Sequence, residues 1–104
     1  MELKDTVKLT LDKGTQRVKC YKFKIKEFKN RELAAHAHTD YKACSTITDV
    51  KTGLRLFTIY KDIAKVTDGD IKEGLDTFVK HFTLEEILKR FKELDEIEEN
   101  KERK

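Results

Sequence analysis

Lysine alternates with apolar residues in the order Tyr-Lys-Phe-Lys-Ile-Lys over residues 21–26. On a β-strand, successive side chains point to opposite faces, so the lysines share one face at a spacing of ~6–7 Å and the apolar side chains share the other. Neighbouring ammonium groups repel one another unless they stay in water or meet a negatively charged partner. The pattern therefore predicts a basic strand face that is either solvated or bound to phosphates or carboxylates.

Further basic residues extend this face, because residues 16–31 hold seven basic side chains against one acidic one. The candidate binding residues are Arg17, Lys19, Lys22, Lys24, Lys26, Lys29 and Arg31. Lysine dominates the set, whereas bidentate recognition of phosphates and base edges favours arginine. Strand alternation also sends the neighbouring rings to the opposite face, where they cannot stack on bases that the lysines hold. We expect a protein partner with an acidic surface, and a nucleic acid is the alternative.

His36 and His38 are the only candidates for metal ligands, and they are weak ones. On a strand both point the same way, but Asp40 on that face lies ~13 Å from His36, too far to share the ion. On a helix the two histidines are about 200° apart and the site vanishes. A single H-x-H pair without a second ligand pair predicts no bound metal, and nothing else in the chain indicates a cofactor.

An enzyme would need a nucleophile, a base and an orienting group, and the only such set combines Cys44 with a histidine and Asp40. Nothing in the spacing of these residues forces them together. The chain has no Gly-rich phosphate loop, no G-x-S-x-G and no H-E-x-x-H. We therefore expect no catalytic residues and no enzymatic activity.

The elements that position these residues begin with strands. Val7, Leu9 and Leu11 alternate with polar residues before a turn over 12–15, which predicts the first arm of a hairpin. In the second arm the apolar phase slips by one residue after Cys20, and a β-bulge between Cys20 and Tyr21 would restore a single core-facing row. Residues 43–48 and 54–60, separated by a turn, predict a second hairpin. The sequence of residues 30–38 is compatible with either a strand or a helix.

The last third of the chain changes to a helical period. Five apolar residues recur at helical spacing, namely Ile71, Leu75, Phe78, Val79 and Phe82, with Asp70 and Glu73 as a capping pair at the start. Thr83-Leu84-Glu85-Glu86 is a capping box for a second helix, which carries an apolar stripe. Two helices meeting near Thr83 are therefore predicted, and the acidic end of the second helix should fray.

The fold predicted from this order is α+β, an antiparallel sheet of about four strands followed by two C-terminal helices packed on one face. We expect a single domain over 1–104, mainly β over about 1–66, two helices over about 70–99 and a frayed tail over 100–104. A chain of 104 residues that is 38% hydrophobic can bury one core. Two cysteines without a CxxC pattern predict free thiols, and the absence of long apolar runs predicts a cytoplasmic protein that does not contact membranes.

Charged residues make up 41% of the chain, yet the net charge is only +3. The basic segment over 16–31 is balanced by the acidic region over 68–104, so both signs are dense on the surface. In general character, small, proline-free, highly charged α+β chains of this kind resemble accessory proteins of phages and mobile elements. We expect a small non-catalytic binding protein that acts on another protein as an inhibitor, adaptor or accessory subunit. Its oligomeric state is left open.

Overall fold

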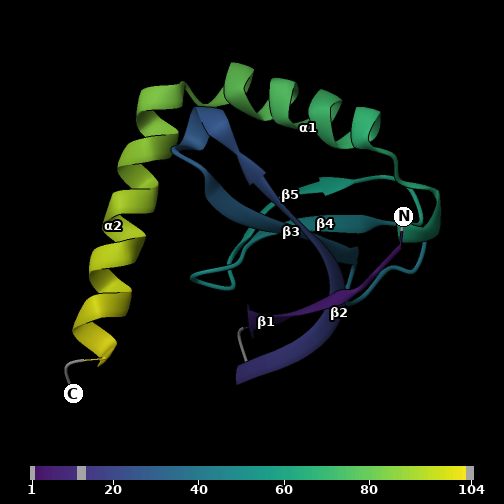
Figure 1. The fold of residues 1–104 in the computed structure, drawn as a ribbon, viewed down its shortest axis with the longest axis horizontal. Helices are drawn as coiled ribbons and strands as arrows, with labels where there is room; N and C mark the ends of the chain where they lie inside the picture. Colours follow the sequence, from purple (N-terminus) through teal and green to yellow (C-terminus); the bar gives the residue numbers. More distant parts are fainter. Residues whose placement is uncertain (1, 12–13, 103–104) are drawn as a thin grey trace.

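The computed structural model describes residues 2–11 and 14–102, with side chains up to Ile97 in the last helix. Five strands form one antiparallel sheet in the order β1-β2-β3-β4-β5, and two helices follow them (Figure 1). The elements are β1 (Asp5–Leu11), β2 (Gly14–Ile25), η1 (Lys26–Phe28), β3 (Arg31–Ala37), β4 (Ser45–Asp49), β5 (Arg55–Ile59), η2 (Ile63–Lys65), α1 (Asp68–His81) and α2 (Leu84–Glu102). The predicted α+β fold is confirmed. The strand in addition to the four expected ones is β3, which lies in the segment 30–38 where the sequence is compatible with either a strand or a helix.

The strand β2 serves two different cores, which explains the phase slip in its sequence. Residues 14–20 pair with β1 and residues 21–25 pair with β3, in both cases without a register shift. The predicted bulge between Cys20 and Tyr21 is therefore wrong. Cys20 packs with Val7 and Ala34 in a core behind the sheet, whereas Tyr21 and Phe23 pack in the core under the helices. The slip marks the residue at which β2 changes both its partner and its buried face.

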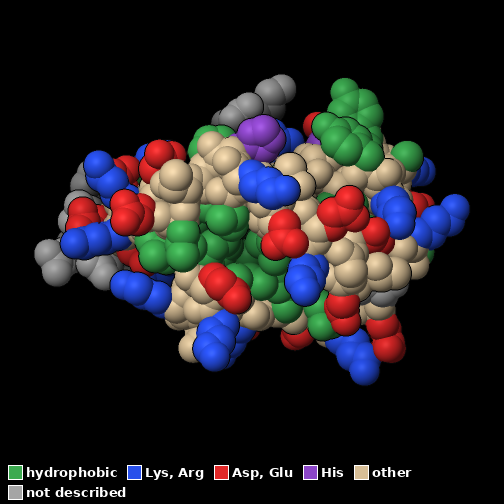
Figure 2. All heavy atoms as spheres, turned by 90° about the horizontal axis from the view of Figure 1, so that it is seen from above, with side chains coloured by type: hydrophobic (Ala, Val, Ile, Leu, Met, Phe, Trp, Pro, Cys, Tyr) green, Lys and Arg blue, Asp and Glu red, His purple; other side chains and the backbone are tan. Residues whose placement is uncertain are grey.

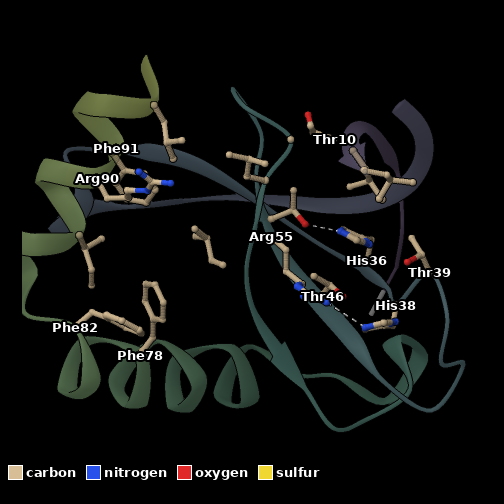
Figure 3. A pocket seen from close by; sticks show the side chains of 18 of the residues that line it. Thr10, His36, His38, Thr39, Thr46, Arg55, Phe78, Phe82, Arg90 and Phe91 are labelled. Carbon is tan, nitrogen blue, oxygen red and sulfur yellow. Dashed lines mark hydrogen bonds between the residues drawn. The ribbon is translucent and has the colours of Figure 1, made fainter. Parts of the chain in front are cut away.

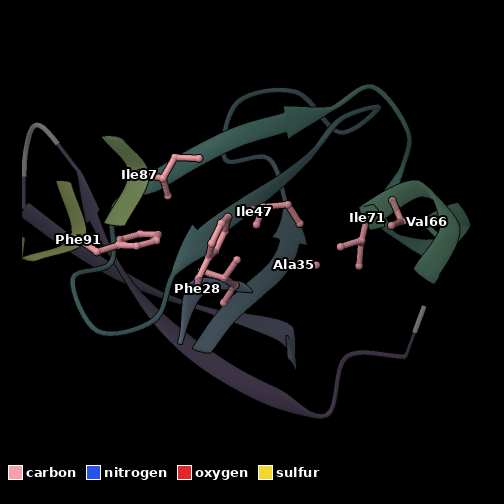
Figure 4. Packing of buried hydrophobic residues seen from close by; sticks show 8 residues of the cluster. Phe28, Ala35, Ile47, Val66, Ile71, Ile87 and Phe91 are labelled. Carbon is pink, nitrogen blue, oxygen red and sulfur yellow. The ribbon is translucent and has the colours of Figure 1, made fainter. Parts of the chain in front are cut away.

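The core under the helices joins the strands β2 to β5 to both helices (Figure 4). Leu33 and Ile47 are fully buried at its centre. Phe28 meets Phe91 of α2 edge to face, with the ring centroids 5.6 Å apart. The apolar residues that alternate with the lysines of β2 pack against this core, as predicted, and they are Tyr21, Phe23 and Ile25.

Both helices begin at side-chain caps, but the predicted capping pair of Asp70 and Glu73 is wrong, because the cap of α1 lies three residues earlier, at Thr67. The Thr67 hydroxyl accepts a hydrogen bond from the Asp70 N–H, and the Asp70 carboxylate accepts one from the Thr67 N–H, so α1 begins two residues earlier than expected. The Thr83 hydroxyl accepts from the Glu86 N–H, and the chain bends there as predicted. The predicted frayed tail over 100–104 extends beyond the described residues, since α2 continues to Glu102 and residues 103 and 104 are not described.

A half-buried arginine joins the sheet to the last helix. Arg31 Nε and Nη2 donate to the two oxygens of Asp49 at 2.7 and 2.8 Å, and Nη2 and Nη1 donate to the two oxygens of Asp95 at 2.8 and 3.0 Å. The guanidinium also lies 4.3 Å from the ring centre of Phe91. The Asp49 carboxylate is fully buried, and leaving such a charge unpaired costs about 3–5 kcal/mol. This ionic cluster therefore fixes β3, the end of β4 and α2 relative to one another.

The same aspartate orders the turn after β4 and ties it to β1. Asp49 Oδ2 accepts hydrogen bonds from the N–H and the hydroxyl of Thr52. The Thr10 hydroxyl donates to the Thr52 carbonyl at 2.7 Å, and the Thr10 N–H donates to the Gly53 carbonyl at 2.9 Å. The outer edge of β1 is thus held against the turn between β4 and β5.

Gly53 is required where this turn meets β1, and we predict that Gly53→Ala lowers the free energy of unfolding by about 2 kcal/mol or more. Its φ is +73°, and an added Cβ would lie 2.5 Å from the Lys8 carbonyl oxygen. Urea denaturation measures the change. Gly69→Ala is the control, because Gly69 lies in α1 and a Cβ added there would lie 3.6 Å from the Thr67 hydroxyl oxygen, an ordinary contact distance. Equal stability of Gly53→Ala and wild type would contradict this account of the turn.

Candidate functional site

The basic residues predicted from the sequence do not form one continuous strip. By strand alternation, Arg17 and Lys19 lie on one face of β2 and Lys22 and Lys24 on the other. The Arg17 side chain is engaged locally, since it donates to the Thr6 hydroxyl at 3.2 Å. Beyond the strand, the predicted set continues with Lys26 in η1 and Lys29 in a left-handed conformation after it.

Arg31 is the predicted binding residue that the fold uses internally. Burial alone would lower its pKa, but the hydrogen bonds with Asp49 and Asp95 outweigh burial and hold the pKa above the ordinary arginine range. All three of its donor nitrogens are occupied by these carboxylates. These bonds use four of the five guanidinium N–H groups, so Arg31 belongs to the ionic cluster.

His36 and His38 lie on the same side of β3, but each ring is oriented by its own hydrogen bonds (Figure 3). His36 is buried, its Nδ1 donates to the Ala37 carbonyl at 2.8 Å, and its Nε2 accepts from the Thr48 hydroxyl at 2.6 Å. Burial lowers the pKa of His36, which favours the neutral ring. His38 Nδ1 accepts from the N–H groups of Asp40 and Tyr41, at 3.0 and 3.3 Å, so its ring proton lies on Nε2.

Neither a metal centre nor a catalytic pair is assembled around these rings in the described part of the chain. Among the side chains described in residues 2–11 and 14–97, no three of His, Cys, Asp or Glu are grouped so as to hold a metal ion. Cys44 follows β3 as a free thiol, and within the described residues no hydrogen bond joins the thiol to the imidazole ring of either histidine. Cys20 is fully buried, and burial raises the pKa of its thiol, which disfavours the reactive thiolate.

The strand β5 has an outer edge that no other strand of the described sheet covers. Every residue of β4 is buried, whereas no residue of β5 is. The His38 N–H donates to the Cys44 carbonyl at 3.0 Å, so the backbone N–H and C=O of Cys44 point toward β3. Backbone groups alternate in direction along an antiparallel strand, so those of Thr46, two residues later, also point toward β3. Thr46 lies opposite Thr58, so this pair exchanges no hydrogen bonds. The N–H and C=O of Thr58 therefore point away from the sheet.

Residues of β5 and α1 line a groove of about 490 Å³ along this edge. Phe57 and Phe78 lie in it with their ring centroids 5.4 Å apart. Gly74 permits this approach, because a Cβ there would lie 2.7 Å from the Phe57 ring. Two strongly exposed rings line the same groove, Tyr60 with 85% and Phe82 with 51% of its surface in solvent. The site thus combines free backbone groups with an aromatic wall.

A second groove of about 670 Å³ begins at the start of β5 and runs to α2. Figure 3 shows the two histidines on one side of it and Phe82, Arg90 and Phe91 on the other. Arg55 Nη1 lies 3.5 Å from His38 Nε2. Both nitrogens carry hydrogens, so this contact brings two donors together rather than a donor and an acceptor.

A third hollow of about 640 Å³ separates β2 from α1. Figure 2 shows hydrophobic side chains gathered in a hollow, with charged side chains of both signs around it. The apolar lining includes Tyr21, Phe23, Ile25, Ile71, Leu75 and Val79. Its rim carries Lys72 and Lys80 as well as Asp68 and Asp76, so charge selects no class of partner.

The sequence predicted a strand over 54–60 but did not identify its edge as a site. Edge position depends on the order of the strands in the sheet, and no local pattern records that order. A usable signal was the composition of the segment, since Arg55 is the only charged residue of β5. Exposed edges usually carry more charge, which prevents unwanted pairing.

Comparison with known proteins adds no assignment, because no family model, curated protein or solved structure matches the chain. Within the part of the chain that the structure describes, no helix has the length and apolar character needed to cross a membrane. Function must therefore be inferred from the groups that the fold leaves exposed.

The hydrogen bonds from Arg31 lower the pKa of Asp95, which makes the contribution of this carboxylate to stability pH-dependent. The folded-state pKa lies below the ordinary value of ~3.9, so the contribution is present above that value and is lost as the pH falls through the folded-state pKa. We predict that Asp95→Asn lowers the free energy of unfolding by on the order of 1 kcal/mol at pH 7. The difference from wild type should shrink as the pH falls from ~4 toward 2, as measured by urea denaturation.

Glu96→Gln is the matched control, because it neutralises the neighbouring exposed carboxylate, which forms no ion pair within the described residues. Its effect should be small at every pH. A difference between Asp95→Asn and wild type that stays constant from pH 7 to pH 2 would show that the ionised carboxylate is not the stabilising species.

Proposed function

We propose that the chain is a non-catalytic protein-binding domain that pairs an extended segment of another protein with the outer edge of β5. The observation that carries this proposal is the outward-facing N–H and C=O of Thr58 at an uncovered sheet edge. A row of such groups at strand spacing is matched by another extended backbone, which is how several peptide-binding domains recognise their targets. The proposal therefore commits to a polypeptide partner that binds as a strand.

The side chains around the edge supply contacts for such a segment. Phe57 and Phe78 form an apolar wall on the helix side, and the exposed rings of Tyr60 and Phe82 line the same groove. Aromatic side chains are enriched at protein interfaces because they bury a large area with few rotatable bonds. Alternate side chains of the added strand would meet this wall, whereas the others would face the back of the sheet.

The opposite edge of the sheet is less suited to strand addition. On β1, Thr10 already uses its N–H and its hydroxyl to bond the turn at residues 52 and 53. Lys8 is exposed on β1, and a charged side chain on an edge strand usually prevents pairing with another chain. These differences favour β5 as the edge that binds a partner.

A protein partner is also favoured over a nucleic acid by the placement of the basic residues. Lys22 and Lys24 lie on the face of β2 opposite to Arg17 and Lys19, and Arg31 uses four of its five N–H groups to bind Asp49 and Asp95. A nucleic-acid surface needs several cations on one accessible face. An inhibitor, an adaptor or an accessory subunit would act through the strand-pairing edge without chemistry of its own.

The direct test replaces one outward backbone N–H. We predict that Thr58→Pro weakens partner binding by about tenfold or more, because it removes this donor and places a ring at the edge. Thr58→Pro should still fold, since proline is tolerated on edge strands where the N–H faces solvent. Thr58→Val is the matched control, because it removes the hydroxyl and keeps the backbone N–H.

The measurement begins with affinity capture from the native host with wild-type, Thr58→Pro and Thr58→Val baits. A partner retained by wild type and Thr58→Val but lost with Thr58→Pro is then purified, and its Kd for each bait is measured by calorimetry. A partner that binds all three baits equally would place the interface elsewhere. Self-association of the pure chain that Thr58→Pro abolishes would identify a second copy, instead of another protein, as the strand that β5 binds.

A further inference from the structure

Two hydrogen-bond donors face each other on the back of the sheet, the face turned away from the helices. His38 Nε2 carries the ring proton, because Nδ1 accepts two backbone N–H groups. Arg55 Nη1 lies 3.5 Å from this nitrogen, and neither group can accept a hydrogen bond from the other. Where side chains are described, over residues 2–11 and 14–97, Arg55 also forms no ion pair. Within that part of the chain, both groups therefore lack an acceptor.

The hydroxyl of Thr46 is a third donor on the same face. Thr46 lies opposite His36 on β3, and only 4% of the residue is exposed. Its hydroxyl forms no hydrogen bond with the described residues. Since no fully buried polar side-chain atom among these residues lacks a partner, the Thr46 oxygen must open on the groove of about 670 Å³ that Thr46 lines. A polar group that is nine-tenths buried and unpartnered calls for a partner from outside the chain.

The strand registers bring the three donors to one place. Arg55 lies opposite Thr48 on β4. The His38 N–H bonds the carbonyl of Cys44, just before the same strand. Thr46 lies midway between these two positions, so the arginine side chain crosses the back of β4 above its hydroxyl. Figure 3 shows the three side chains on the same wall of the groove.

We propose that these three donors bind the oxyanion group of a small molecule, either a phosphate or a carboxylate. An oxygen atom between Arg55 and His38 accepts from both, and the Thr46 hydroxyl donates to the same oxygen or to its neighbour on the oxyanion. Hydrogen bonds between a charged donor and an oxyanion are about twice as strong as neutral ones. The volume of the groove, about 670 Å³, is in the range of small-molecule sites.

The proposed oxyanion site goes beyond the pairing of a partner strand with β5 and does not depend on it. His38 lies two strands inward from the outer edge of β5, because β4 separates the two. A small molecule reaches the site from solvent through the groove, without contact with that edge. The chain would thus carry a ligand site on the back of the sheet in addition to its strand-pairing edge.

Two of the three donors are held in place before any ligand arrives. The two backbone hydrogen bonds of His38 fix its ring, which also lies 5.2 Å from the Tyr41 ring. Thr46 belongs to β4, in which every residue is buried. Donors oriented in advance lose little conformational entropy when the ligand binds. Asp40 lines the same groove, but it forms no ion pair with Arg55 in the described structure, so the guanidinium stays available.

Titration of the chain with inorganic phosphate and, separately, with acetate tests the inference, and sodium chloride at equal ionic strength is the blank. Amide proton–nitrogen correlation spectra report the site through the backbone signals of His38 and Thr46 and the Nε–H signal of Arg55. We expect saturable shifts of these signals with at least one of the two anions, at a Kd on the order of millimolar. Saturation by phosphate alone identifies a phosphate site, and saturation by acetate alone identifies a carboxylate site.

Two variants assign the anion to the three donors. Arg55→Gln removes the charge, and we expect it to raise the Kd by about tenfold. Thr46→Val removes the hydroxyl at nearly unchanged shape, and we expect it to raise the Kd by about threefold. Arg90→Gln is the matched control, because it removes a positive charge from the opposite wall of the same groove and should leave the Kd unchanged.

Shifts that stay linear for both anions up to about 50 mM would overturn the oxyanion site. The same conclusion would follow from a Kd that is unchanged in Arg55→Gln. Equal weakening by Arg55→Gln and Arg90→Gln would also overturn it, because the anion would then respond to net charge alone. The effect of Thr58→Pro on partner binding is measured separately, so either proposal can fail without the other.

Discussion

The contacts of Arg31 with Asp49 and Asp95 hold together parts of the chain that are far apart in sequence. Asp49 is fully buried and would be costly to leave unpaired, so the guanidinium must occupy its position whenever β3 and β4 are paired. The other side of the guanidinium bonds Asp95 and stacks on Phe91, which places α2 over the helix-side core. Hydrophobic burial supplies most of the driving force, but this cluster determines which surfaces meet.

The cluster also determines which edge of the sheet stays open. From Asp49, hydrogen bonds continue through Thr52 to Thr10, so one network reaches from the last helix to the first strand. That network ties β1 to the turn before β5 and starts β5 in a fixed direction along α1. The result is a sheet with one edge attached to its own turn and one edge unpaired. The proposed binding of a partner strand follows from this asymmetry.

Much of the fold could be predicted from the sequence because its signals are local. Alternation predicted the strands, the helical period predicted both helices, the Thr83 cap predicted the start of α2, and the faces of Tyr21 and Phe23 followed from strand geometry. Predictions that depended on long-range contacts were less informative. The slip after Cys20 has its cause in a second core that includes Ala34, and Arg31 meets an aspartate 64 residues away. The uncovered edge of β5 depends on strand order, which no local pattern encodes.

Residue-resolved amide hydrogen exchange of the isolated chain tests the central claim most directly, because it reports which backbone N–H groups of β5 lack a partner. The account predicts that the Thr58 amide exchanges much faster than the Ile59 amide, which faces Ser45 on β4. Addition of the partner strand should then protect Thr58. Equal and strong protection of Thr58 and Ile59 in the isolated chain would contradict the account, since it would show that the outer edge of β5 is already paired.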